Sequence, residues 1–332
     1  MTDSDATAVL GFGLATAALG DSAAQLATIA AGRPLYERHP RWVGRDGQRQ
    51  IMCWAPGLED YSDYPSRVAL LLQRAWAECR AAEADKAHLA GDRARMVVVL
   101  PLTVGHFPGM RASFDQMAAR LNFAGLAEIR YVFGEHAAGL GAFSQARQWL
   151  KQDPKRPVYL AAADCWCAPV MLDALAAMGI LRDRNNPWSP IPSEGAVCLK
   201  LSLPDPGTPT ILVRNHGHAI EEVRLADPSR GVMGRGLAQA AQKTLMPGCD
   251  IARIYSDAGA ERWRAEELGV ALSALMPAAS DWPLVSPMQA VGEIGAASSL
   301  LAVVLASQQP GTSLVLSSER GGIKRAALVE PI

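Results

Sequence analysis

A strand, a turn and a helix follow one another in the stretch Ile129-Arg130-Tyr131-Val132-Phe133-Gly134-Glu135-His136-Ala137-Ala138-Gly139-Leu140. Its first five residues include β-branched and aromatic side chains, which favour a strand. The small residues that follow open an apolar pattern at helical spacing, which predicts a helix over Gly139–Leu150. A strand that leads directly into a helix is the repeating unit of α/β proteins.

The same alternation of strands and helices extends over the whole chain in two halves. The first half contains further predicted strands at Thr7–Gly11, Arg95–Leu100, Pro157–Ala161 and Ala196–Leu201, and helices at Ser22–Ala31, Ser66–Ala82 and Met110–Leu121. The second half contains predicted strands at Thr210–Arg214, Ile251–Tyr255, Leu284–Ser286, Ser313–Leu316 and Ala326–Val329, and helices at Gly236–Leu245, Glu261–Leu275 and Ala296–Ser307. A hinge is predicted between the halves at Pro204-Asp205-Pro206-Gly207. The shared order indicates an internal duplication, with halves at residues 1–206 and 207–332 packed as one body.

Composition excludes several classes of function. The chain has 332 residues and is 49% hydrophobic, enough for a large core. Its 32 basic and 33 acidic residues leave no positive excess, so neither a nucleic acid nor an anionic membrane is the expected partner. The N-terminal region predicts neither a signal peptide nor a membrane span, and a cytoplasmic location is expected. The six cysteines form no C-x-x-C pair, so no metal and no cofactor is expected.

Five short motifs then point to one family. They are Gly11-Phe12-Gly13 with Leu19-Gly20, Ala161-Ala162-Ala163-Asp164, Pro192-Ser193-Glu194-Gly195-Ala196, Gly292-Glu293-Ile294-Gly295-Ala296-Ala297-Ser298, and Ser318-Glu319-Arg320-Gly321-Gly322. In order and spacing they resemble the motifs of the β-ketoacyl synthases of the thiolase superfamily, over nearly the full chain. The resemblance implies the thiolase fold, an α/β architecture of duplicated five-layer α-β-α-β-α type.

The chain departs from this family at the positions that carry its chemistry. The resemblance implies a catalytic cysteine at a helix N-terminus, where the helix dipole and backbone N–H groups favour a thiolate. That position falls on His136 or, with a shift of one residue, on Ala137. The two family positions for His, or for His and Asn, fall on Asp257 and Glu293, and the aromatic gate falls on Arg320. This chain therefore resembles a degenerate member that lacks the Cys-His-His/Asn triad.

These replacements argue against carbon–carbon bond formation. Condensation needs an acyl-thioester intermediate, which an imidazole cannot replace without a large loss of rate. Two carboxylates beside a thioester oxygen would also repel the negative charge that develops there. We expect His136, Asp257, Glu293 and Arg320 to converge on one buried pocket. Either their charges pair with one another, with the carboxylates favouring a proton on His136, or they form a repurposed site for acid–base chemistry or for a polar ligand.

Three classes of function follow from these observations. The first is a non-condensing partner or scaffold subunit of bacterial type, either like a chain-length factor or like an accessory protein of secretion gene clusters. The second is an acyltransferase or hydrolase with a repurposed pocket that uses His136 as a base, and the third is an acyl-ligand binding module. The resemblance implies a homodimer or a heterodimer with a related synthase, and an acyl carrier protein or a secretion component as a further partner. The resemblance implies that the dimer forms through the strand around Tyr159–Ala163 and the helix after it, and an unpaired apolar edge there would be an aggregation hazard.

Three other constellations have plainer interpretations. Asp164-Cys165-Trp166-Cys167 could offer two metal or redox ligands, but small buried side chains at the end of a sheet are favoured. Asn215-His216-Gly217-His218, with Glu221 and Glu222 nearby, lacks a third zinc ligand and is interpreted as a solvent-facing turn. The helix start Glu261–Glu267 is interpreted as a solvated face that carries an Arg262–Glu266 pair, although its acidic end matches acids that brace the site in relatives.

Overall fold

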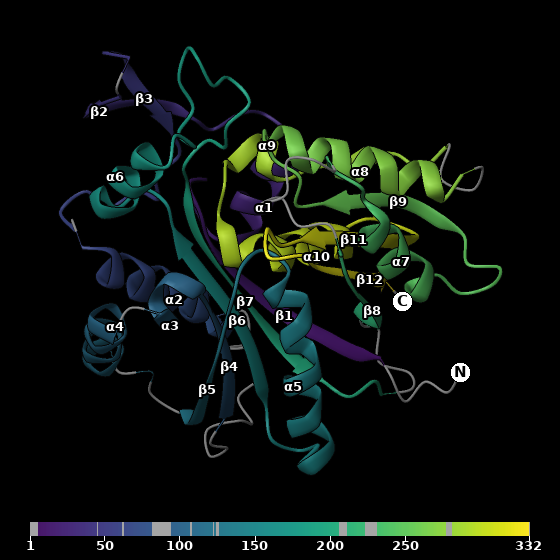
Figure 1. The fold of residues 1–332 in the computed structure, drawn as a ribbon. Helices are drawn as coiled ribbons and strands as arrows, with labels where there is room; N and C mark the ends of the chain where they lie inside the picture. The colour runs from purple at the N-terminus through teal and green to yellow at the C-terminus, as the bar shows by residue number, and fades with distance from the viewer. Residues whose placement is uncertain are drawn as a thin grey trace.

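The computed structural model describes residues 6–44, 46–61, 63–81, 94–106, 108–121, 123, 126–205, 211–222, 231–276 and 281–331. Its first half contains β1 (Thr7–Ala15), α1 (Ser22–Ala30), β2 (Glu37–Val43), β3 (Arg49–Met52), α2 (Tyr64–Ala81), β4 (Ala94–Pro101), α3 (Leu102–His106), α4 (Pro108–Leu121), β5 (Leu126–Gly134), α5 (Ala138–Gln152), β6 (Val158–Cys165), α6 (Pro169–Ala177) and β7 (Glu194–Ser202). Its second half contains β8 (Ile211–Ile220), α7 (Arg235–Thr244), β9 (Ile251–Ser256), α8 (Arg262–Ala274), β10 (Leu284–Val285), α9 (Met288–Val291), a 3-10 turn (Gly295–Ala297), α10 (Ser298–Ser307), β11 (Thr312–Ser318) and β12 (Ile323–Pro331) (Figure 1).

The strand order of the main sheet shows the duplication directly. In the described part of the chain its ten strands run β10-β9-β11-β12-β8-β1-β7-β6-β4-β5. Read outward from β1, the first half runs β1-β7-β6-β4-β5, with two antiparallel pairings followed by two parallel ones. Read outward from β8, the second half runs β8-β12-β11-β9-β10 with the same sequence of pairings. The halves meet where β1 and β8 pair antiparallel through Ala8 and its two neighbours. Of the predicted boundary, Pro206 and Gly207 lie outside the described residues.

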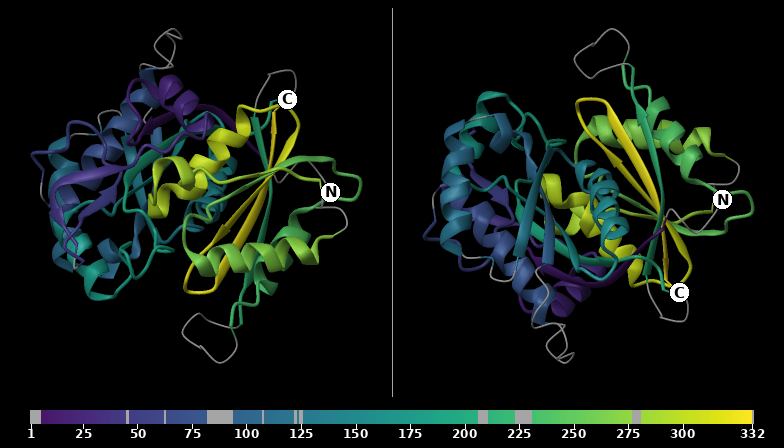
Figure 2. Two further views of the ribbon diagram at one scale, coloured as in Figure 1. Left: turned by 90° about the horizontal axis from the view of Figure 1, so that it is seen from above. Right: turned by 90° about the horizontal axis from the view of Figure 1, so that it is seen from below.

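Three apolar cores separate the layers. One lies between α2, α4 and α6 and the outer face of the first half-sheet, and another lies between α7, α8 and the second half-sheet. The third surrounds α5 and α10, which contact strands of both halves. All ten residues of α10 are buried, as expected for a helix that is apolar on every side. Figure 2 shows these two helices enclosed between the halves, so the layers run helix, sheet, helix, sheet, helix. The five-layer thiolase architecture predicted from the sequence is confirmed.

Most predicted elements are present, and local signals explain several of their ends. Asp21 caps α1, because its Oδ1 accepts a hydrogen bond from Ala24 N over 2.9 Å. The β2–β3 hairpin is not among the predicted elements, because its first strand is mostly exposed and polar and has no apolar pattern. No described helix has the length and the apolar composition that crossing a bilayer needs.

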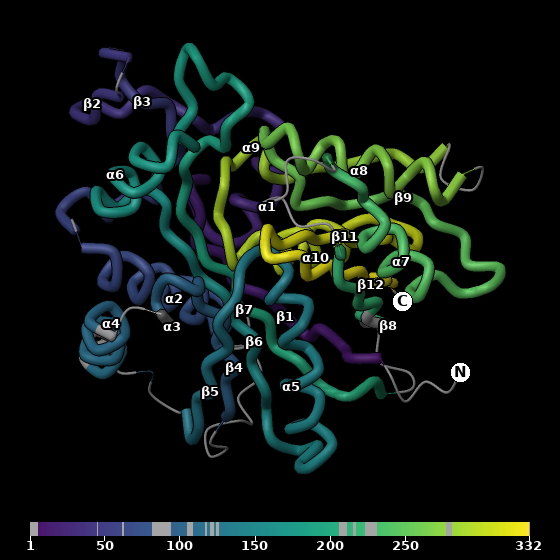
Figure 3. Tube along the Cα trace, in the orientation of Figure 1, coloured from purple at the N-terminus to yellow at the C-terminus, as the bar shows by residue number. Residues whose placement is uncertain are grey.

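Two predictions about strands are wrong. Gly217 and His218 do not form a solvent-facing turn, because β8 continues through them to Ile220 and pairs with β12. Tyr159–Ala163 is not a sheet edge, because β6 pairs with β4 on one side and with β7 on the other. The edge strand of the first half-sheet is β5, whose path can be followed in Figure 3.

A buried ion pair ties α2 to the start of β7. Arg67 donates to both oxygens of Glu194, over 2.8 Å from Nε and 2.5 Å from a terminal nitrogen. Ala55 N and Cys165 Sγ donate to the same carboxylate over 2.9 and 3.0 Å. Arg67 also donates to a backbone carbonyl oxygen, that of Leu58, over 2.7 Å. Because every charged atom here has partners, the burial of both charges is tolerated.

We predict that Glu194→Gln lowers the free energy of unfolding by about 3–5 kcal/mol, because it leaves the buried Arg67 without its counter-charge. The double variant Arg67→Met with Glu194→Leu should recover part of that loss. Urea denaturation measures both. The matched control is Arg262→Ala, which breaks an exposed pair with Glu266 and should cost less than about 1 kcal/mol. A Glu194→Gln effect no larger than that of the control would contradict the prediction.

Candidate functional site

The turn between β5 and α5 presents His136 to the interior. β5 ends at Gly134 and α5 begins at Ala138, which places His136 just before the helix N-terminus with only 4% of its surface exposed. Gly134 is required here because a Cβ would lie 2.4 Å from the Ala138 Cβ. Gly139 allows α5 to approach α10, since a Cβ at that position would lie 2.5 Å from Ser299 Oγ. The local sequence therefore produces a tight, buried turn with an imidazole at its tip.

Glu293 is held opposite His136 by its own backbone. Its N–H donates to Ile191 O over 2.8 Å, and its carbonyl oxygen accepts from Ser193 N over 3.2 Å. These bonds join the segment before α10 to the segment that enters β7, and they form an isolated parallel bridge with Pro192. The side chain therefore projects from a position that two segments fix.

The His136 and Glu293 side chains form a direct buried pair. The His136 Nε2 to Glu293 Oε1 distance is 2.7 Å, with 5% and 1% of the side chains exposed. Glu293 Oε1 also accepts from Gly295 N over 3.0 Å and from Ser298 Oγ over 3.3 Å. Glu293 Oε2 has no hydrogen-bond partner among the described residues. Oε1 therefore has three hydrogen-bond partners, whereas the buried Oε2 has none among the described residues.

Arg264 is the charged residue that sequence reasoning missed. It lies on α8 with 1% of its side chain exposed, and it pairs with Glu261 Oε2 over 2.7 Å and with Asp257 Oδ2 over 3.2 Å. It also donates to Ser318 O over 2.9 Å. The interpretation of Glu261–Glu267 as a solvated face is therefore wrong for its inner residues, although Arg262 and Glu266 pair at the surface as predicted.

A sequence signal for the burial of Arg264 does exist. Leu268, Ala271 and Leu275 continue its position at helical spacing, and all three are buried. A residue in line with such an apolar stripe faces the interior whatever its charge. The helix therefore carries its cation on the inner face.

Asp257 and Arg320 lie at two ends of this charged network. Asp257 follows β9, and its Oδ2 accepts from Ser318 N over 3.0 Å as well as from Arg264. Arg320 has 40% of its side chain exposed and forms an ion pair with Glu261. Asp257 and Arg320 are joined through Arg264 and Glu261, whereas His136 and Glu293 form a separate pair on which Arg264 acts through its charge. Among the described residues Arg320 pairs with Glu261 and not with Glu293, so the expected pairing of all four side chains with one another is not seen.

The charges of the network shift one another's protonation. Burial and the Arg264 charge oppose a proton on His136, but Glu293 and Asp257 outweigh them, and the pKa of His136 is raised above 6.5. Burial would raise the pKa of Glu293, but His136 and Arg264 lower it below 4.5. The pKa of Glu261 shows the same balance, since burial opposes ionisation while Arg264 and Arg320 bring it to about 2. The carboxylates therefore favour a proton on His136.

No thiol is available at the turn. His136 and Ala137 occupy the two candidate positions, and burial raises the pKa of Cys165 and Cys167 well above the ordinary value. These two thiols instead donate to Glu194 Oε2 and to Cys53 O, as expected for packed interior groups. Among the described residues no group of three or more His, Cys, Asp or Glu side chains is placed to hold a metal ion.

We predict that Arg264→Met lowers the free energy of unfolding by about 3–5 kcal/mol, because Glu261 and Asp257 then lack their buried counter-charge. Arg320→Ala is the matched comparison, and its half-exposed ion pair should contribute less than about 1 kcal/mol. Guanidinium denaturation of both variants measures the difference. Equal losses for the two substitutions would show that the interior cation is not the one that holds the network.

We also predict a pH dependence of stability from the His136–Glu293 pair. The raised pKa of His136 makes its contribution complete below pH 6.5 and lost as pH rises through the folded-state value. The lowered pKa of Glu293 makes its contribution complete above pH 4.5 and lost as pH falls through the folded-state value. The pair therefore stabilises most between these two values. Melting temperatures of wild type and His136→Asn should converge as pH rises from about 6 to about 9, and a constant difference would refute the assignment.

No family model and no curated protein matches this sequence. Solved structures do match it. A ketosynthase/chain length factor of ishigamide biosynthesis is 16% identical, with a TM-score of 0.71 over 98% of this chain and 99% of that one. A chain in the complex of a type II PKS acyl-carrier protein with its hexaketide-bound ketosynthase is 14% identical, with a TM-score of 0.78 over 99% of this chain and 100% of that one. A β-ketoacyl synthase from Burkholderia phymatum is 15% identical, with a TM-score of 0.72 over 99% and 100%. The chain therefore has the thiolase-like fold of ketosynthases and chain length factors.

Proposed function

We propose that this protein is a non-condensing partner subunit of the chain-length-factor type, which associates with an active ketosynthase. The observation that carries the proposal is the buried pair of His136 with Glu293, 2.7 Å apart, at the turn that should hold a nucleophile. The imidazole is held by a carboxylate and surrounded by fixed charges. A side chain in that position supports the fold of the site and does not attack a thioester.

The electrostatics of the turn support the same conclusion. A condensing site must present hydrogen-bond donors to a carbonyl oxygen that becomes negative. Here Glu293 presents an unpaired carboxylate oxygen, and Asp257 adds a second buried acid. Ser256, the hydroxyl-bearing residue just before Asp257, uses its Oγ to accept from Ala258 N over 3.1 Å. Neither thiol chemistry nor serine chemistry has the groups that it needs.

The free edge of the first half-sheet supplies a surface for the partner. Among the described strands β5 pairs only with β4, and Ile129, Tyr131, Val132 and Phe133 are partly exposed along it. An edge of this kind is a hazard unless another strand covers it. The opposite edge, β10, has two residues. We infer that a strand of the partner adds to β5, which places the partner beside the turn that carries His136.

The relatives support a partner of the synthase class. Two of the similar structures are a ketosynthase/chain length factor and a keto synthase–chain length factor, and a third is a complex of a ketosynthase with its acyl-carrier protein. A related synthase is therefore the first partner to test, and a second copy of this chain is the alternative. An acyl carrier protein would then meet the assembled pair.

We predict that Val132→Glu weakens this association, because it places a charge at the half-buried edge. The matched control is Val270→Glu on α8, a position 42% exposed in the other half. Each variant is co-expressed with a related synthase and analysed by affinity co-purification and sedimentation velocity. The control should remain in a complex or in a homodimer while Val132→Glu sediments as a monomer. A wild-type monomer at micromolar concentrations, without any bound synthase, would contradict the proposal.

We predict no condensation by the wild type, and none by His136→Cys alone. The new thiol would lie at the N-terminus of α5, yet Asp257 and Glu293 would still oppose the oxyanion. Mass spectrometry should show increased alkylation of His136→Cys by iodoacetamide relative to His136→Ala, while turnover of malonyl and acyl thioesters stays at background. Turnover by wild type at ordinary synthase rates would overturn the assignment.

A further inference from the structure

A cavity of about 840 Å³ opens beside Glu293. Tyr36, Trp188 and Met288 are among its lining side chains, so its walls are largely apolar and aromatic. Trp188 has 67% of its surface exposed although it borders this cavity, and a large exposed indole is stabilised when a ligand covers it. The cavity has the size and the composition of a small-molecule site.

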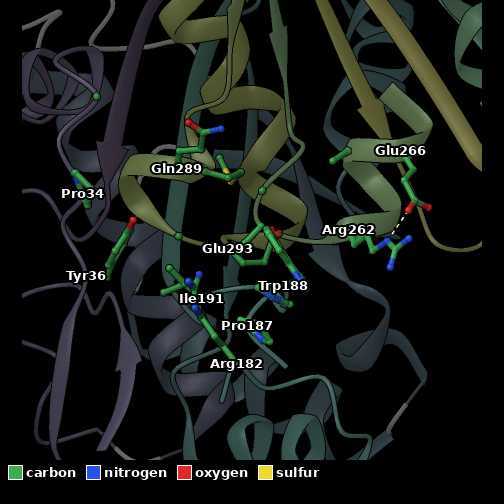
Figure 4. A pocket seen from close by; sticks show the side chains of 17 residues that line it. Pro34, Tyr36, Arg182, Pro187, Trp188, Ile191, Arg262, Glu266, Gln289 and Glu293 are labelled. Atoms are coloured by element: carbon green, nitrogen blue, oxygen red, sulfur yellow. Dashed lines mark hydrogen bonds and ion pairs between the residues drawn. The ribbon is translucent and has the colours of Figure 1, made fainter. Parts of the chain in front are cut away.

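Arg182 provides a charged group within reach of a ligand in this cavity. It is half-buried, and in the view of Figure 4 its side chain lies between those of Tyr36 and Trp188. Its backbone is fixed, because the Arg182 carbonyl oxygen accepts from the side-chain amide of Gln50 over 3.3 Å. Within the described parts of the chain the guanidinium of Arg182 forms no ion pair and no hydrogen bond. It is therefore free to bind an anion.

The acids of the lining do not cancel this charge. Glu266 is paired with Arg262 over 2.5 Å. Glu293 has only 1% of its side chain exposed and its Oε2 is buried, so its carboxylate is not presented to the cavity. The positive charges of His136 and of Arg264, whose Nη2 has no partner among the described residues, both act on Glu293. The accessible charge of the lining is therefore that of Arg182.

The segment beside the cavity adds positive charge of its own. Arg33 lies between two lining residues, and Arg38 and Arg41 follow it on the exposed strand β2. Over residues 33–44, which the structure describes throughout, these three arginines are accompanied by one acid, Glu37. Fixed charges of one sign raise the local concentration of a ligand of the opposite sign. The cavity therefore favours an anion over a cation.

We propose that this cavity binds an aromatic monocarboxylate, whose carboxylate group is held by the guanidinium of Arg182. A guanidinium presents parallel N–H donors that match the two oxygens of a carboxylate. Tyr36 and Trp188 contact the aromatic body of the ligand, and the single accessible cation of the lining matches its single negative charge. The site goes beyond the proposed association with a synthase and uses residues that do not lie on β5, so either can fail without the other.

Calorimetric titration with matched probes tests this class of ligand. 2-Naphthoate and 4-phenylbutyrate are each compared with the neutral amide and with the amine of the same skeleton. At least one carboxylate should bind saturably with a Kd below about 1 mM. Its amide and its amine should bind at least about tenfold more weakly, because only the carboxylate forms hydrogen bonds between two charged groups with Arg182. Equal or tighter binding of the amide or the amine would overturn the proposal, and so would the absence of binding by both carboxylates.

Two pairs of variants locate the binding. Arg182→Gln should weaken carboxylate binding by about tenfold or more, whereas Arg184→Gln, which removes an exposed arginine outside the lining, should leave it unchanged. Trp188→Ala should weaken it by about tenfold, whereas Met178→Ala, at a position 63% exposed and outside the lining, should not. None of the four side chains is fully buried, so all four variants should fold. An unchanged affinity in Arg182→Gln or in Trp188→Ala would refute the site.

Discussion

The neutralisation of one interior guanidinium is the constraint on which the centre of this protein depends. Arg264 is fully buried, and a buried cation is tolerated only when anions and carbonyl oxygens surround it. Glu261 comes from the start of the same helix, Asp257 from the end of β9 and the Ser318 carbonyl from the end of β11. The end of β11 must therefore meet the connection between β9 and α8, although these segments are far apart in sequence. The charge of Arg264 also lowers the pKa of Glu293, the partner of His136.

The layered fold could be predicted from the sequence because burial imposes a period on its elements. The continuous apolar runs Leu300–Ala306 in α10 and Met96–Leu100 in β4 predict buried elements. The end of β8 could not be predicted, because Gly217 and His218 have the composition of a turn. The glycine has another cause, since a Cβ there would lie 1.9 Å from the carbonyl oxygen of Ala240 on α7. Close helix packing, which depends on the tertiary structure, makes a turn-like residue part of a strand.

The candidate site likewise combines features that the sequence predicts with contacts that depend on the tertiary structure. His136 and Glu293 could be placed together because motif order carries that information. The burial of Arg264 is hard to predict because its neighbours Arg262 and Glu266 are a typical exposed pair, although the apolar stripe through Leu268 lies on the same face of the helix as Arg264. The prediction of β6 rather than β5 as the free edge is wrong because the order of strands along the chain does not determine their order in the sheet. Such errors concern which elements are neighbours, and only the assembled sheet resolves them.

The two carboxylate oxygens of Glu293 have different surroundings. Oε1 accepts hydrogen bonds from His136, Gly295 and Ser298 and holds the turn to α10, while Oε2 is buried without a hydrogen-bond partner among the described residues. His136 lies two residues after the end of β5, the edge at which we place the partner. The pair that holds this turn therefore lies next to the edge at which the partner is proposed to add.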